Sequence, residues 1–169
     1  LSFVLSLIFG VAGLMTRHLE WDARSLVAVQ LGMLFGVTGL LQGMAWARVE
    51  WGAAWSWDPR QTGLALALMV YGACLALRSG IEDPQRQARL AAVYTVLAAP
   101  TAMFLIFVLP YLPGMVSLHL RPGQAQMGGQ YSRTIAMAAV AFLCLYAWVF
   151  SLATRVTMLA WRREGRLEG

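Results

Sequence analysis

The segment WGAAWSWDPRQT, residues 51–62, separates two long apolar stretches and carries three tryptophans, an acid and a base. On a helix, Trp51, Trp55 and Asp58 would line one face, because they are spaced by four and then three residues. The proline after Asp58 disfavours helical geometry at the residue before it, and aspartate is a favoured N-cap. The sequence therefore predicts that a new helix begins here, with Gln61 completing a capping-box-like pattern.

The composition around this segment is that of a membrane protein. Of the 169 residues, 59% are hydrophobic and 12% charged, about half the charged fraction of a soluble domain. All basic residues are arginines near the ends of apolar runs, which indicates a role in topology rather than nucleic-acid binding. Cys74 and Cys144 lie in separate apolar runs, so C-x-x-C redox and C-x-x-C-H haem-attachment motifs are excluded, and both cysteines are expected to be buried packing residues.

Apolar runs predict an all-α integral membrane protein with about five transmembrane helices in a single polytopic domain over residues 1–169. The runs cover residues 1–16, 26–45, 62–77, 90–109 and 134–154. The first would span about 24 Å against the ~30 Å of a hydrocarbon core, so we expect the native chain to extend upstream of Leu1. Pro100 is expected to kink the fourth helix and to free a carbonyl group.

Glycines recur along one face of the second apolar run, at Gly32, Gly36, Gly39 and Gly43. Such overlapping G-x-x-x-G pairs let another helix approach closely in lipid, so helix packing is the first interpretation. A groove that admits the edge of a flat ligand is the alternative.

The distribution of arginines predicts the orientation in the membrane. One side carries Arg17, Arg24, Arg78, Arg86, Arg89, Arg155, Arg162, Arg163 and Arg166; the other carries Arg48, Arg60, Arg121 and Arg133. The larger set is expected in the cytoplasm. The tryptophan-rich segment, residues 46–61, and the Pro- and Gly-rich loop, residues 110–133, would then share the outer face.

Tryptophans also collect in interfacial belts, but the order of residues here is more specific. WGAAWSWDPRQT resembles the W-G-x-x-W-x-W-D-P/A-R-x-T signature of the "WWD" haem-handling membrane proteins of cytochrome c maturation, the CcmC, CcmF and CcsA group. Its W-D-x-R-x-T part and the short chain are most similar to the CcmC-like haem-delivery proteins. The resemblance covers the topology of the whole chain and is strongest over residues 46–62. It implies six transmembrane helices and two outward histidines that ligate haem.

The resemblance implies a non-covalent, b-type haem on the outer face, with His119 of the Leu118-His119 motif as an axial ligand. Three indoles would form an aromatic wall, and outer arginines would pair with the propionates. The candidate cofactor-binding residues are Trp51, Trp55, Trp57, Asp58, Arg60, His119, Arg121, Arg48 and Arg133. Each also has a structural interpretation: loop histidine, interfacial tryptophan, helix cap or snorkelling arginine.

Two features depart from the family pattern. The upstream histidine, expected in an H-V-P context just before the helix that starts at Leu1, has no counterpart in this sequence. His18 cannot replace it, because it is predicted on the cytoplasmic side, as a solvated loop residue. The segment between Pro100 and His119 also lacks the paired tryptophans of the family.

The leading hypothesis is a haem-binding subunit of a bacterial inner (plasma) membrane, not an enzyme, that delivers haem to a periplasmic haem chaperone in cytochrome c biogenesis. The resemblance implies three kinds of partner: ABC-type transporter subunits, a small single-helix membrane protein and the chaperone. One alternative is a haem-lyase or cytochrome c synthase subunit of the CcmF or CcsA kind. The other is a structural membrane subunit with interfacial tryptophans.

Overall fold

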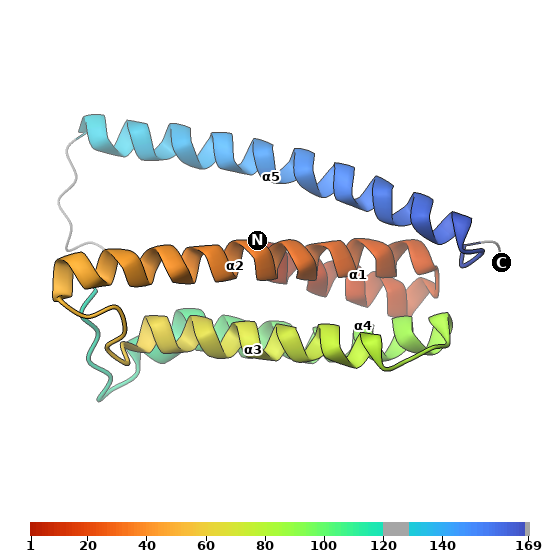
Figure 1. Cartoon of the computed structure of the whole chain (residues 1–169), viewed down its shortest axis with the longest axis horizontal. Coiled ribbons are helices and arrows are strands. Elements are labelled where there is room, and N and C mark those ends of the chain that lie inside the picture. The colour runs from red at the N-terminus through yellow and green to blue at the C-terminus, as the bar shows by residue number, and fades with distance from the viewer. Residues whose placement is uncertain (120–128, 168–169) are drawn as a thin grey trace.

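The computed structural model describes residues 1–119 and 129–167, and every regular element within them is helical. The α-helices are α1 (Ser2–Thr16), α2 (Leu19–Trp51), α3 (Pro59–Ser79), α4 (Pro84–Met103) and α5 (Gly129–Arg163). A π-helical segment, η1 (Phe104–Val108), and a 3-10 turn, η2 (Leu109–Tyr111), continue α4. The first four helices form a bundle, and α5 runs lengthwise beside α2 (Figure 1).

Four helical segments are long and apolar enough to cross a membrane: α2, α3, α4 with its continuation to Tyr111, and α5. The shorter α1 is apolar, but its 15 residues rise only about 22 Å, less than the ~30 Å of a hydrocarbon core. The predicted class, an all-α integral membrane protein, is confirmed. The described residues contain four candidate spans and one short apolar helix.

The sequence predicted a polar connector over residues 17–24 and a membrane span that begins at Leu26. In the structure, α2 already begins at Leu19. Asp22 accounts for the difference: Arg78 of α3 donates from Nη1 and Nη2 to its two carboxylate oxygens, at 2.6 and 2.8 Å. The side chains are only 5% and 8% exposed. A bidentate partner makes a buried carboxylate tolerable inside the helix. Arg78 is therefore an internal partner rather than a simple flanking charge.

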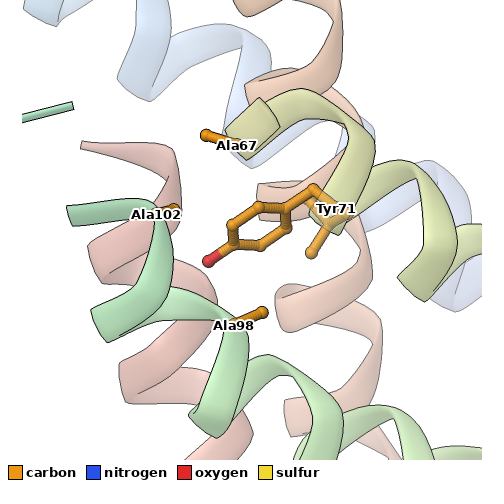
Figure 2. Packing of buried hydrophobic residues seen from close by; sticks show 5 residues of the cluster. Ala67, Tyr71, Ala98 and Ala102 are labelled. Atoms are coloured by element: carbon orange, nitrogen blue, oxygen red, sulfur yellow. The ribbon is translucent and has the colours of Figure 1, made fainter. Parts of the chain in front are cut away.

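Tyr71 of α3 is the largest fully buried side chain in the described structure. Figure 2 shows its ring between Ala67 of its own helix and Ala98 and Ala102 of α4. Phe3 of α1 stacks on the same ring, with the centroids 4.2 Å apart. The alanines leave room for this one large ring, so α4 packs against both α1 and α3, and the stacked rings of Phe3 and Tyr71 join α1 to α3.

The glycine groove of α2 is used only in part. A side chain at Gly32 would collide with α1, and one at Gly36 would overlap a leucine of α3. Gly39 and Gly43 have no described atom within 4 Å of the position that a Cβ would occupy. The helix-packing interpretation therefore applies to the first two glycines.

The last helix, α5, approaches the bundle along α2, and its Tyr146 hydroxyl lies 2.9 Å from the hydroxyl of Ser2 in α1. Only 6% of the apolar stretch of α5 is buried inside the described structure.

The expectation that both cysteines are buried is half right: Cys74 is buried, whereas Cys144 is exposed. Cys144 precedes the buried Tyr146 by two residues, which places it on the opposite face of α5.

The end of α4 departs from α-helical geometry a few residues after Pro100, where η1 begins. Here the backbone of η1 passes very close to α3: a Cβ added at Gly63 would overlap the carbonyl oxygen of Leu105. π-helical segments of this kind are frequent at functional sites. The close approach brings the chain that follows η1 to the start of α3.

Candidate functional site

The tryptophan-rich segment is not helical throughout. Helix α2 ends at Trp51 because Gly52 adopts a left-handed conformation with φ 79°, the usual helix stop that glycine tolerates best. The prediction that Trp51, Trp55 and Asp58 line one helical face is therefore wrong. Trp57 is also left-handed, with φ 57°, which is a strained conformation for a bulky residue.

Asp58 caps α3 as the sequence predicts: its Oδ1 accepts from the backbone N–H of Arg60 at 2.8 Å, and Pro59 occupies the first helical position. The predicted capping box takes a different form. Gln61 Oε1 accepts from the backbone N–H of Ser56 at 3.3 Å, and Gln61 Nε2 donates to the Ala54 carbonyl at 3.3 Å. Gln61 therefore closes the tryptophan loop rather than bonding to Asp58.

The carboxylate of Asp58 has a second role that capping does not explain. Its Oδ2 accepts from the Ser117 hydroxyl at 2.8 Å and from the Leu118 backbone N–H at 2.7 Å. Its Oδ1 lies 3.2 Å from Nδ1 of His119. Asp58 is only 3% exposed. One buried carboxylate thus joins the start of α3 to the loop that carries the candidate histidine.

The environment of Asp58 favours its ionised form. Burial by itself raises the pKa of this carboxyl, but hydrogen bonds from Ser117, Arg60 and Leu118, together with the nearby His119, outweigh it. The net effect is a pKa below the ordinary value of 3.8. Asp58 is therefore a carboxylate acceptor at neutral pH.

His119 is oriented by this carboxylate. We assign the proton of the neutral imidazole to Nδ1, because Nδ1 faces the ionised Asp58 and can donate to it. The lone pair then lies on Nε2, for which no described residue supplies a hydrogen-bond partner. The side chain is 29% exposed, and the backbone N–H of His119 donates to Ser117 Oγ at 3.2 Å. The imidazole is therefore held at Nδ1, and its side chain is partly exposed.

Two indoles surround the imidazole. Trp51 meets it edge-to-face, with centroids 4.7 Å apart and planes at 81°, and Trp46 lies 6.4 Å away. Trp55 and Trp57 instead pair with each other, at 5.7 Å, and Trp57 is 77% exposed. The expected wall of three indoles is thus divided in two. Trp46 was not predicted as a site residue. The sequence feature that could have indicated it is its position five residues before the twelve-residue motif.

The four predicted outer arginines are placed differently from one another. Arg60 lies beside the histidine loop, where its Nη2 donates to the Tyr111 hydroxyl at 3.0 Å and its guanidinium sits 5.6 Å over the Tyr111 ring. Arg48 and Arg133 are exposed on the last turns of α2 and the first turns of α5. Arg121 lies outside the described residues. The structure therefore brings Arg60 to the site.

A cavity of about 150 Å³ opens next to the imidazole. Its lining residues are Arg60, Pro110, Tyr111, Met115, Val116, Ser117 and His119. Tyr111 and Ser117 were not predicted as site residues, and only their closeness to His119 in the sequence could have indicated them.

His18 is exposed at the far end of the bundle, at the turn between α1 and α2, as expected for a solvated connector.

Comparison with known proteins identifies relatives of this architecture. A family model described as "Cytochrome C assembly protein" matches residues 2–117. Two proteins named "Heme exporter protein C" are similar over 90% of the chain, at 29% identity in Bradyrhizobium diazoefficiens and 24% in Paracoccus denitrificans. The chain spans 59% and 65% of their lengths. A "Cytochrome c biogenesis protein CcsA" of Prochlorococcus marinus is 35% identical over 47% of the chain and 25% of its own length. Because the family model covers well over half of the sequence, including the tryptophan segment and the Asp58 cap, this chain belongs to the cytochrome c assembly protein family.

Proposed function

We propose that the chain is a haem-binding membrane subunit of cytochrome c biogenesis, which presents haem at the outer membrane face and passes it to a haem chaperone. The family and the names of the two haem-exporter relatives support a haem-handling role. Binding and release are non-covalent in this proposal, so the chain itself makes and breaks no covalent bond.

The observation that carries the proposal is the Asp58–His119 pair. Metal-bound histidines usually donate their second ring N–H to a carboxylate, which fixes the tautomer and raises the basicity of the ligating nitrogen. His119 has this arrangement, with Nδ1 3.2 Å from the Asp58 carboxylate, and its side chain is 29% exposed. One such imidazole suits haem iron, because the porphyrin supplies four nitrogens of its own.

The surroundings of His119 fit a haem that is held at its edge. The adjoining cavity of about 150 Å³ is smaller than the roughly 300–1,000 Å³ of pockets that enclose a drug-sized ligand. Trp51 and Trp46 add an aromatic surface beside the imidazole. A haem bound here would keep much of its surface outside the protein, which suits a carrier that hands its cargo to another protein.

The propionates would find cationic partners around the same loop. Arg60 lies at the cavity, and the amino-terminal end of α3 adds the positive end of a helix dipole. Arg48 and Arg133 are exposed, so their side chains are accessible to a bound propionate. Trp55, Trp57 and Arg121 complete the proposed site, with Arg121 in the part of the loop that is not described.

The arginine distribution supports an outward, periplasmic orientation of this site in a bacterial inner membrane. The remaining partners belong to the same proposal: ABC-type transporter subunits, a small single-helix membrane protein and the periplasmic chaperone. The region around the tryptophan segment would be the surface that the chaperone contacts, because the haem edge is exposed there.

The direct test is the visible spectrum of the purified full chain with haem available. We expect a Soret band that is lost or shifted in His119→Ala and retained in His18→Ala, whose histidine lies at the other end of the bundle. Trp51→Leu should weaken haem retention more than Trp57→Leu, since only Trp51 contacts the imidazole. A Soret band unchanged by His119→Ala would remove this residue from the ligand set. No band at all in the wild type would favour the structural-subunit alternative.

The similarity to the CcsA protein supports a second candidate, a subunit of a haem-lyase or cytochrome c synthase. The two functions differ in their acceptor. A haem-delivery subunit transfers haem to a chaperone, whereas a lyase subunit supports thioether formation on an apocytochrome. Mixing the haem-loaded chain with either acceptor and following the haem by absorbance would separate them.

A further inference from the structure

At the end of the bundle opposite His119, a second and larger cavity of about 480 Å³ lies between three helices. Its walls are the last turns of α1, the first turns of α2 and the first turns of α4. Its volume is in the range of pockets that hold small ligands. The haem proposal makes no use of this cavity, which lies at the opposite end of the bundle from His119.

The rim of the cavity carries excess positive charge. Arg17, Arg86 and Arg89 all line it. Among the lining residues the one acid is Asp22, and both of its carboxylate oxygens are bonded to Arg78, which lies outside the lining. Within the described part of the chain, none of the three rim arginines forms an ion pair. Their charge is therefore available to an anionic ligand.

The carboxylates nearest in sequence do not cancel this charge. Asp83 is engaged in capping α4, where it accepts from the Arg86 backbone N–H at 2.6 Å. Glu20 is the partner of Arg24, at 4.0 Å. Neither these two acids nor Glu82, which precedes Arg86 by four residues, lines the cavity.

Along its α1 and α4 walls the cavity changes from cationic to apolar with depth, whereas the α2 wall carries the buried polar residues Asp22 and Ser25. Arg17 follows the last residue of α1, whereas Phe9 and Leu14 of the same wall lie one to two turns deeper in the helix. On α4 the order is the same, with Arg86 in the first turn and Val93 two turns further in. This order matches the boundary between a phospholipid headgroup and its acyl chains at a membrane surface.

Arg17 is held at the rim by the backbone. It adopts a left-handed conformation with φ 59°, and its N–H donates to the Gly13 carbonyl at 2.9 Å, which terminates α1. A non-glycine residue in this conformation is strained, and such positions often have a functional reason. Asparagine or glycine would terminate the helix with less strain but would lack the cation.

We propose that this cavity binds the phosphate of an anionic phospholipid from the membrane leaflet on this side, such as phosphatidylglycerol. The rim arginines pair with the phosphate, and Phe9, Leu14 and Val93 contact an acyl chain. Arginine suits this role because its guanidinium bonds phosphate oxygens in a bidentate manner. The depth profile favours a lipid over inorganic phosphate, because a free phosphate would leave the apolar half of the cavity without a ligand.

The test is native mass spectrometry of the full chain in detergent, titrated with dioleoyl-phosphatidylglycerol and, separately, with dioleoyl-phosphatidylcholine. We expect preferential retention of phosphatidylglycerol. The double variant Arg86→Gln/Arg89→Gln should lose about thirty-fold in affinity for it. The matched control is Arg162→Gln/Arg163→Gln, which removes the same charge from the end of α5 on the same side without touching the cavity. This control should bind almost as the wild type does.

Three results would overturn the proposal. Equal retention of the two lipids by the wild type would exclude recognition of the anionic headgroup. An equal loss in the control variant would mean that surface charge in general attracts the lipid. Displacement of phosphatidylglycerol by millimolar inorganic phosphate would identify a free-phosphate site instead. The wild-type comparison and the phosphate competition decide the matter even if the double variant fails to fold.

Discussion

The exchange Asp58→Asn tests whether the carboxylate controls the tautomer of His119. Asparagine is tolerated at an N-cap and Pro59 still occupies the first helical position, so α3 should begin at the same residue. The amide nevertheless has one acceptor oxygen where the carboxylate has two, and the wild-type oxygens receive two backbone N–H groups, from Arg60 and Leu118, on opposite sides. One of these N–H groups must lose its acceptor.

The consequence for the imidazole follows from the same geometry. We expect the amide oxygen to stay with Ser117 and Leu118, so that the Arg60 N–H loses its acceptor; the NH₂ group then faces Nδ1 of His119, which must accept a hydrogen bond. The imidazole proton moves to Nε2, and the lone pair that would bind iron is lost. Loss of an outer carboxylate of this kind typically lowers metal affinity 10- to 100-fold, equivalent to about 1.4–2.7 kcal/mol. Leaving a buried N–H without its acceptor costs a further ~1–3 kcal/mol of folding stability.

The assay is a haem titration of the full chain in detergent at pH 7, followed at the Soret band, with thermal unfolding measured on the same samples. The matched control is Asp83→Asn, because Asp83 is also followed by proline and also caps a helix, at the other end of the bundle. We expect Asp83→Asn to bind haem as the wild type does. Haem affinity within twofold of the wild type in Asp58→Asn, with the same spectrum, would refute the reasoning, and so would an equal loss in the control.

Three further predictions concern stability. Gly63→Ala should destabilise the chain by about 1–3 kcal/mol, because its methyl group would overlap the Leu105 carbonyl and push η1 from α3; an unchanged thermal midpoint would contradict this close approach. Asp22→Asn should cost about 3–5 kcal/mol in unfolding measurements, because it leaves the Arg78 charge buried and unpaired, whereas Asp22→Leu/Arg78→Leu should cost less. The stability that the ionised Asp58 contributes should be present above its ordinary pKa of 3.8 and be lost as the pH falls through its depressed folded pKa; the difference in thermal midpoint between wild type and Asp58→Asn should shrink below about pH 3.8, and an unchanged difference in that acidic range would exclude the linkage.

The sequence alone was sufficient for the features that depend on neighbouring residues. Length and apolarity of the runs determine that the chain is helical and crosses a membrane, because a backbone in lipid must satisfy its own hydrogen bonds. The Asp58-Pro59 pair determines where α3 begins, since a cap acts within a few residues. The order of the tryptophans, the aspartate and the arginine was enough to indicate the family, and the family model supports it.

Tertiary structure decided what the capping aspartate contacts. Its partners Ser117 and Leu118 are 59 and 60 residues further along the chain, and no local pattern connects them to Asp58. They meet it because η1 approaches α3 closely at Gly63 and delivers the following loop to the end of the bundle. The same applies to the Asp22–Arg78 pair. From the sequence, both residues were expected to be solvent-exposed charges at the ends of apolar runs. Helix caps and apolar runs can be recognised from residues within a few helical turns of one another. These contacts join residues that are far apart in the sequence, so they depend on how separate helices pack in the folded chain.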